Sequence, residues 1–308
     1  MRNACLDMVH ELAKRDPRVI YIGSDPGPGT LSKMQAEFPD RFFIEGISEQ
    51  NVIGMAAGFA MEGFIPYVNT IATFLTRRCF EQAAIDLCLH NLPVRLIGNG
   101  GGMVYAPLGP THTAIEDIAI MRALPNMTVV VPTDAEEMKR FMAATLDWPA
   151  PIYIRLAKGK DPVVDNPDGA FIIGKGRLVG DPAPVLVVAT GTTVYPALAA
   201  ARTLTAEGIG TTVLNLQTIK PLDTALLDRA CRDARLVVSV EEHVRDGGLG
   251  TAVLEALADL GRCPPRMIRL GLPDAFRHHY GSQAQHLKAE GLSKEGIEAR
   301  IREAFDRG

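Results

Sequence analysis

Short apolar runs of β-forming residues alternate with segments of helical periodicity along most of this chain. One such run, VIYIG at 19–23, follows a segment in which Leu6 and Val9 stand at helical spacing. The pattern recurs where a helical stretch at 80–90 leads into PVRLIGN, and where MTVVVPT at 127–133 leads into DAEEMKRFM. Uninterrupted apolar strands that alternate with helices predict a parallel sheet covered on both faces. We therefore expect an α/β fold.

A helix start is predicted after the third of these runs. Pro132 precedes Thr133, and Thr133 with Glu136 forms the T-x-x-E pattern of a capping box. In such a box the two side chains bond to free N–H groups of the first turn. We therefore expect a helix to begin at Thr133.

The length and a local shift in composition predict two domains. The chain has 308 residues, whereas a domain typically has about 100 to 200. Between 157 and 181 it becomes rich in proline, glycine and charge, which is typical of an exposed connector. We expect a first domain at 1–165, a linker at 166–182 and a smaller second domain at 183–308, each a three-layer α/β/α fold.

The second half opens a new series of the same units. Strands are predicted in VLVVATG, TTVLNLQ and LVVSVEE, with helical stretches between them. The tail places Ile297, Ile301 and Phe305 four residues apart, which predicts one apolar stripe of a closing helix.

Composition excludes several classes of protein. With 32 Lys and Arg against 36 Asp and Glu, and 47% apolar residues, the chain is neither a disordered tail nor a binder of nucleic acid by bulk positive charge. No apolar run approaches the roughly 18 to 20 residues that span a bilayer. Asp7 and Glu11 interrupt the stretch where a signal peptide would be apolar. We expect a cytoplasmic protein that binds neither membrane nor nucleic acid.

The cysteines and histidines do not form a recognisable pattern. The five cysteines are odd in number, scattered and never spaced C-x-x-C, and no H-x-x-x-H pair occurs. His278 and His279 are adjacent, so in a regular element they would point in different directions. We expect neither a disulfide framework nor a metal site built by this chain alone.

General catalytic motifs leave the site undetermined. The chain has no G-x-S-x-G elbow, Walker A loop or H-E-x-x-H pair. The glycine-rich pieces at 25–30, 98–102 and 246–250 are better explained as tight turns than as phosphate cradles. Residue patterns by themselves therefore indicate two α/β domains and no particular reaction.

A resemblance to a known family indicates a particular reaction. The segment EGISEQNVIGMAAGFAMEGFIPYVNTIATFL at 45–75, followed by LGPTH at 108–112, resembles the pyrimidine-binding domain of transketolases and of 1-deoxy-D-xylulose 5-phosphate synthase. The second half is similar to the C-terminal domain of that family through ATGT, KPLD, VSVEE, GGLG and GLPD. The resemblance implies a thiamine diphosphate enzyme that transfers a two-carbon ketol unit from a ketose to an aldehyde.

The same resemblance implies roles for five residues. Glu49 corresponds to the glutamate that holds a proton at the pyrimidine N1′, Phe74 to the aromatic that packs on that ring, and Phe80 to a second ring of the pocket. His112 corresponds to the histidine that faces the reacting carbonyl, and Arg155 to an arginine that grips a substrate phosphate. The alternatives are structural: a solvated Glu at a helix start, core Phe residues, a loop His and a surface ion pair.

The part of the family that binds the diphosphate has no counterpart in the sequence. Its G-D-G signature and later Asn pair are missing, and the Asp-Gly pairs at 168–169 and 246–247 stand in other contexts. The resemblance therefore implies a split enzyme. An N-terminal transketolase subunit would supply the diphosphate site and its Mg²⁺, the cofactor would lie between the chains, and the assembly would be an α2β2 heterotetramer.

Three positions depart from the family's substrate pocket. Leu108 stands where transketolases have an Asp, Gly100 where a His or Arg would contact the acceptor's phosphate, and Ile71 where the synthase has a Tyr. A site built on hydrogen bonds loses discrimination when an apolar group replaces one of them. The hypothesis is an acceptor other than an ordinary aldose phosphate.

Two other functions are compatible with these motifs. The β subunit of a 2-oxo acid dehydrogenase joins the same two kinds of domain, but LGPTH and GLPD favour a transketolase. A non-catalytic scaffold subunit is the other, although a scaffold needs neither Glu49 nor His112.

Overall fold

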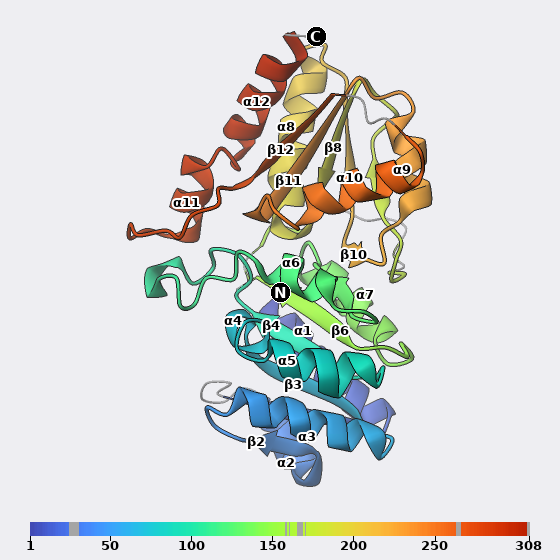
Figure 1. Cartoon of the computed structure of the whole chain (residues 1–308), viewed down its shortest axis with the longest axis vertical. Coiled ribbons are helices and arrows are strands. Elements are labelled where there is room, and N and C mark those ends of the chain that lie inside the picture. Colours follow the sequence, from blue (N-terminus) through green and yellow to red (C-terminus); the bar gives the residue numbers. More distant parts are fainter. Residues whose placement is uncertain are drawn as a thin grey trace.

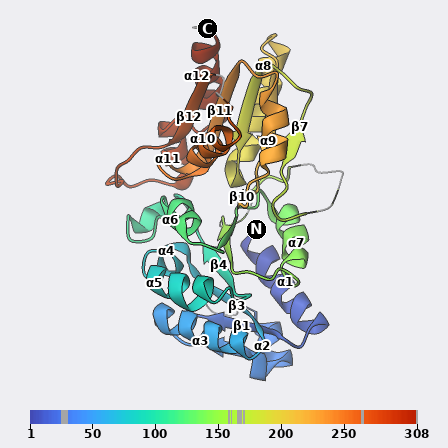
Figure 2. The same ribbon diagram turned by 45° about the vertical axis from the view of Figure 1, so that its right-hand side comes forward.

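The chain folds into two α/β domains, one above the other in Figure 1. This computed structural model describes residues 1–24, 31–157, 159, 161–164, 169, 171–262 and 266–306. Figure 2 shows that each sheet lies between layers of helices. The predicted α/β class with two three-layer domains is confirmed.

Among the described residues, seven strands form the first sheet, and all but the last of them in the sequence run parallel to their neighbours. The exception, β10, comes from the second half of the chain and pairs antiparallel with β5 at one edge. The order across the sheet is β10 (Thr218–Lys220), β5 (Thr128–Val130), β6 (Ile152–Leu156), β4 (Arg95–Asn99), β3 (Ile65–Ile71), β1 (Val19–Gly23) and β2 (Phe42–Ile44).

Helices cover both faces of this sheet because its strands are apolar on both sides. In β1, Val19 and Tyr21 pack into one cluster, whereas Ile20 and Ile22 pack into the other. The first cluster lies under α1 (Arg2–Arg15), α2 (Ser32–Glu37) and α7 (Ala135–Ala144). The second lies under α3 (Glu49–Met61), α4 (Ala72–Leu75), α5 (Phe80–Gln82), the π-helical turn η2 (Ala83–Leu89) and α6 (Asp117–Ala123).

The described part of the second domain repeats this plan with five strands. Their order is β12 (Arg266–Leu272), β11 (Leu236–Val244), β8 (Val185–Ala189), β9 (Thr211–Asn215) and β7 (Arg177–Val179), of which only β7 is antiparallel. One face packs on α8 (Val194–Ala206) and α12 (Lys294–Asp306), and α11 (Gln283–Ala289) joins the same cluster. The other face packs on α9 (Thr224–Cys231) and α10 (Leu249–Asp259).

Short 3₁₀ turns complete the described elements. They are η1 (Pro39–Arg41), η3 (Ala106–Leu108) and η4 (Gly191–Thr193). The predicted closing helix is α12, in which Ile297 and Ile301 are buried and Phe305 packs against the same cluster.

Two short strands cross the domain bounds expected from the sequence. Strand β7 lies inside the predicted linker at 166–182 and already belongs to the second sheet. Strand β10 belongs to the first sheet although it lies within 183–308. Three-residue strands carry too little periodicity to be assigned from sequence, because a distant partner strand defines them. One apolar cluster also runs through both domains and joins them.

The predicted helix start was misplaced. Helix α7 begins at Ala135 with Asp134 as its N-cap, and the Asp134 carboxylate accepts from the N–H groups of Glu136 and Glu137. Glu137, not Glu136, reaches back, and it accepts from the Thr133 N–H at 2.6 Å. The D-x-x-E pattern one residue further along prevails because a carboxylate is the stronger acceptor at a helix start.

None of the helices in the described part of the chain is long and apolar enough to cross a membrane. Within the same residues, no group of three or more His, Cys, Asp or Glu side chains is placed to hold a metal ion. The described cysteines, Cys5, Cys79, Cys88 and Cys231, are free thiols, and Cys263 lies outside the described residues.

Candidate active site

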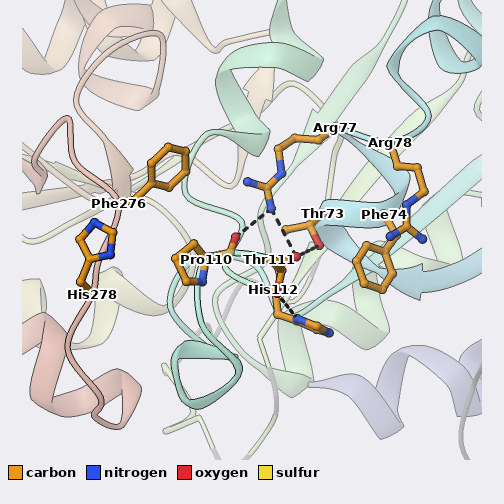
Figure 3. Close-up of a pocket in the computed structure, with 9 residues that line it drawn as sticks. All are labelled: Thr73, Phe74, Arg77, Arg78, Pro110, Thr111, His112, Phe276 and His278. Carbon is orange, nitrogen blue, oxygen red and sulfur yellow. Dashed lines mark hydrogen bonds between the residues drawn. The ribbon is translucent and has the colours of Figure 1, made fainter.

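A pocket of about 680 Å³ lies beyond the carboxyl ends of β3 and β4 (Figure 3). Ligands of open α/β sheets commonly bind at this edge, where loops follow the strands. Both domains contribute to its wall. Its lining residues are Thr73, Phe74, Arg77, Arg78, Pro110, Thr111 and His112 of the first domain, and Phe276 and His278 of the second.

Glu49 is bonded to Arg78, one of the residues of this wall. It is the first residue of α3, is 3% exposed, and accepts hydrogen bonds from Ser24 Oγ at 3.0 Å and from an Arg78 guanidinium nitrogen at 2.7 Å. Burial by itself would raise the pKa of Glu49. The hydrogen bonds from Arg78, from its own backbone N–H and from Ser24 outweigh burial and lower that pKa. The side chain is therefore a carboxylate at neutral pH.

Phe74 and Arg78 form the part of the wall next to Glu49. The Arg78 guanidinium carbon lies 4.1 Å from the centroid of the Phe74 ring, and Figure 3 shows the one side chain across the other. Gln50 donates to the backbone carbonyl of Arg78 at 3.2 Å, which holds the main chain at this point. One planar cation therefore contacts both a buried carboxylate and an aromatic face.

His112 packs against the same Phe74 ring. The two ring centroids are 5.4 Å apart and the planes meet at 67°, an edge-to-face contact. His112 Nδ1 lies 2.8 Å from Thr111 Oγ1. The turn before it needs a glycine, because Gly109 has a φ of +80° and its carbonyl accepts from the His112 N–H at 3.0 Å.

Arg77 holds the loop that carries His112. It is paired with Glu116 at 3.0 Å and donates to the Pro110 carbonyl at 3.0 Å. Thr73 Oγ1 donates to the Thr111 carbonyl at 3.3 Å, and Figure 3 draws these bonds to the loop together. The two adjacent arginines thus have separate partners, since Arg78 pairs with Glu49 and Arg77 with Glu116.

The structure brings three of the predicted site residues together: Glu49, Phe74 and His112. Four others lie apart from the pocket wall. Phe80 begins α5 and packs against the core, and Ile71 is half-buried at the end of β3. Leu108 ends the turn η3, and its side chain is 56% exposed. Gly100 has a φ of +76° and lies against the Tyr105 ring, so a side chain at this position would clash.

Arg155, for which a phosphate contact is predicted, does not line this pocket and lies at the junction between the domains. Its side chain is 7% exposed, and Nε pairs with Asp117 at 2.8 Å. Another guanidinium nitrogen donates to the carbonyls of Ala114 at 3.0 Å and Glu242 at 2.8 Å. Nε and one terminal nitrogen are thus bonded to protein groups, because Asp117, 38 residues upstream, folds against this side chain.

The VSVEE motif forms a buried junction between the domains. Glu242 accepts from the Met103 N–H at 2.6 Å and from Gln283 at 2.9 Å, which ties the loop after β4 to α11. Glu241 accepts from the first N–H groups of α10, at 2.6 and 2.8 Å. Burial raises the pKa of Glu241 to about 7 and lowers the pKa of His243 to about 4. This motif is therefore structural.

Several lining residues were not predicted from the sequence. The pair Arg77 and Arg78 follows Phe74 closely in TFLTRR, so a basic pair next to a predicted aromatic was the available signal. Phe276 and His278 come from the second domain. Only the packing of one domain on the other brings them to this pocket, so no local pattern predicts them.

Comparison with known families agrees with this architecture. Residues 1–162 match the pyrimidine-binding domain of transketolase, and residues 174–301 match its C-terminal domain. The chain belongs to the transketolase family, and the resemblance predicted from the sequence is confirmed.

Two relatives show how much of a protein this chain resembles. One of the subunits of the apulose-4-phosphate transketolase of Phocaeicola vulgatus is 35% identical over 298 residues, which are 96% of this chain and 94% of the relative. The 1-deoxy-D-xylulose-5-phosphate synthase 1 of Geobacter sulfurreducens is 38% identical over 302 residues, 97% of this chain but 47% of the synthase. The chain thus spans about half the length of the synthase and nearly all of the apulose-4-phosphate transketolase chain.

Solved structures agree with these relatives. A chain described as a split gene transketolase, inactive beta4 tetramer, superposes with a TM-score of 0.88 at 35% identity, covering 98% of this chain and 97% of that one. A transketolase of Campylobacter jejuni superposes with a TM-score of 0.80 at 20% identity, covering 98% of this chain and 46% of that one. The second likeness shows a shared fold alone.

Proposed function

We propose that this chain is the subunit of a split, thiamine diphosphate-dependent transketolase that holds the pyrimidine half of the cofactor. The complete enzyme would transfer a two-carbon ketol unit from a ketose to an aldehyde. The observation that carries the proposal is the ionised, buried Glu49, which Arg78 links to the face of Phe74, with His112 against the same ring. The full-length likeness to one chain of a transketolase that is itself made of subunits supports the division into two chains.

The residues fit the proposed cofactor. The flat guanidinium of Arg78 donates to Glu49 and stacks on Phe74. A flat ring with an N–H group in its plane could make the same two contacts. When bound, thiamine diphosphate would supply a nucleophilic carbanion at its thiazolium C2. Glu49 would hold a proton at the pyrimidine N1′, and a buried carboxylate makes that charge-assisted bond strong.

The other two residues would act on the ring face and on the substrate. Phe74 would pack on the pyrimidine ring and exclude water from it. His112 would exchange a proton with the oxygen of the reacting carbonyl, a role that suits an imidazole at neutral pH. Because Thr111 holds Nδ1, Nε2 is the nitrogen available for this transfer.

A partner chain would complete the site. We assign the diphosphate and Mg²⁺ to an N-terminal transketolase subunit, and propose that two copies of each chain form an α2β2 heterotetramer. A similar chain has been described as an inactive beta4 tetramer, which supports the need for a second kind of chain.

The acceptor is proposed to differ from an ordinary aldose phosphate. Leu108 is an exposed apolar side chain, and Gly100 has no room for a side chain at all. Arg155 binds Asp117 through Nε and two carbonyls through one terminal nitrogen, so most of its donors are already engaged. These three observations support an acceptor recognised by apolar or differently placed polar groups.

The test is to reconstitute the chain with the N-terminal subunit, thiamine diphosphate and Mg²⁺, and to measure ketol transfer from several ketoses to several aldehydes. We expect transfer that needs both chains. Decarboxylation of a 2-oxo acid in place of ketol transfer would contradict the proposed reaction. Turnover of ribose 5-phosphate or glyceraldehyde 3-phosphate as efficient as that of any other acceptor would contradict the proposed acceptor class.

A further inference from the structure

Arg78 occupies the place that the proposed function assigns to the pyrimidine ring. Its guanidinium donates to Glu49 at 2.7 Å and lies 4.1 Å from the centroid of Phe74. These are the two residues that would bind the ring nitrogen and the ring face. A guanidinium is flat, carries N–H donors in its plane and stacks on aromatic rings, so it satisfies both partners at once.

We propose that Arg78 is an internal stand-in for the aminopyrimidine: it occupies Glu49 and Phe74 in the cofactor-free chain and must swing away before the cofactor binds. The inference rests on the proposed function, because that function places the ring between these two residues.

The burial of the two partners makes such an exchange feasible. The Glu49 side chain is 3% exposed, whereas that of Arg78 is 44% exposed. A buried carboxylate without a partner is unfavourable, so the site gains from a cation while the ring is absent. An exposed arginine can return to water at little cost, so the same cation can be displaced.

The main chain does not need to move for this exchange. Gln50 holds the backbone carbonyl of Arg78, and Cys79, next to it, is fully buried in the core. Only the side chain of Arg78 would have to change rotamer, and it lines the pocket, where it has room to turn.

Arg77 provides a matched control. It lies on the same pocket and carries the same charge, but it is paired with Glu116 and donates to the Pro110 carbonyl. Its removal lowers the positive charge of the pocket and leaves the contacts of Glu49 with Arg78 and Ser24 in place.

The first experiment is calorimetric titration of thiamine diphosphate, with Mg²⁺, into the two-chain complex. Arg78→Ala is expected to bind about two- to fivefold more tightly than the unaltered complex, because it loses one competing, partly exposed ion pair. Arg77→Ala is expected to bind no more tightly. Unchanged or weaker binding by Arg78→Ala, or equal tightening by Arg77→Ala, would overturn the proposal. If the unaltered complex and both variants bind no cofactor, the proposed function itself fails.

The second experiment needs no cofactor and uses the single chain. Carbon-13 NMR of the Glu49 carboxyl follows its protonation in the unaltered chain and in Arg78→Ala. We expect the pKa of Glu49 to rise in the variant, because it loses the guanidinium that favours its charged form. An unchanged pKa would show that Arg78 does not occupy Glu49 in solution and would overturn the stand-in, whatever the reaction is.

Discussion

Two ion pairs of the first domain combine the same groups in opposite settings. Arg78 joins Glu49 at the pocket, and Arg155 joins Asp117 at the junction between the domains. Both carboxylates are buried, with exposed fractions of 3% and 0%. The arginines differ, because Arg78 is 44% exposed and Arg155 is 7% exposed.

The difference in exposure indicates a ligand-binding role for Arg78 and a structural role for Arg155. An arginine in contact with water can exchange its carboxylate for a ligand, whereas a fully enclosed one cannot leave without stranding a charge. Arg155 also donates to carbonyls on both sides of the junction, while Arg78 stacks on a ring that faces the pocket. We therefore expect pocket substitutions to affect turnover and junction substitutions to affect stability.

The largest effect is expected at the junction. Asp117→Ala leaves the buried Arg155 guanidinium without its carboxylate and removes the acceptor of the Tyr153 hydroxyl. The free energy of unfolding should fall by about 3 to 5 kcal/mol. Denaturant unfolding of the single chain measures it. Asp117→Asn keeps the shape of the side chain and should lose less of the free energy of unfolding. A loss below about 1 kcal/mol in Asp117→Ala would contradict the structural role of the Arg155–Asp117 pair.

The second effect falls on turnover. Glu49→Gln keeps the shape of the side chain but removes its charge, so it should slow ketol transfer by the two-chain complex about 10²- to 10³-fold. Assembly should remain, as judged by size-exclusion chromatography with light scattering. Normal turnover would instead favour a scaffold role or a different base.

The third effect concerns pH. Glu241, whose pKa is raised from 4.5 to about 7, stabilises the fold below pH 4.5 and loses that contribution as pH rises toward 7. His243, whose pKa is lowered from 6.5 to about 4, contributes above pH 6.5 and loses its contribution as pH falls toward 4. The two slopes oppose each other between these limits, so we expect the contributions of these two groups nearly to cancel in the unaltered chain.

Single variants should reveal each slope. In Glu241→Gln, stability should fall on acidification below pH 6.5, and in His243→Asn it should fall as pH rises from 4.5 to 7. Each slope is at most about 1.4 kcal/mol per pH unit, the value for one proton. Denaturant unfolding at several pH values provides the test. Parallel profiles for both variants would be inconsistent with these shifts.

The smallest effect is expected at Arg77. Arg77→Ala frees the Pro110 and Thr111 carbonyls, so His112 is held less firmly, and kcat should fall about tenfold. The KM of the donor should change less than kcat, because the histidine acts mainly on the reacting carbonyl. Arg77→Lys, which keeps the charge, should recover part of the rate. A rise of KM with unchanged kcat would show that Arg77 contacts the substrate instead.

Much of the fold could be predicted because each long strand carries its own signal. The run VIYIG is β1, and the run LVVSVEE forms the start of β11, since buried parallel strands are apolar on both faces. The location of β7 and β10 could not be predicted, because each has three residues and is defined by a partner strand elsewhere. The start of α7 was misplaced by competition between two overlapping capping patterns.

The sequence predicted those site residues that stand inside a motif resembling the family. Glu49, Phe74 and His112 stand in motifs that resemble the family, and the structure brings them together. The environment of Arg155 could not be predicted because it depends on Asp117, which no local pattern connects to it. Arg78 reaches both Glu49 and Phe74 because α3 packs against the turn after α4. The spacing of apolar residues in the sequence does not predict this packing.

The most direct test is the structure of the two-chain assembly with thiamine diphosphate and Mg²⁺ bound. We expect a Glu49 carboxylate oxygen within hydrogen-bond distance of the pyrimidine N1′, the Phe74 ring on the face of that pyrimidine, and the Arg78 side chain turned away from both. A pyrimidine bound elsewhere, with Arg78 still joined to Glu49, would contradict this expectation.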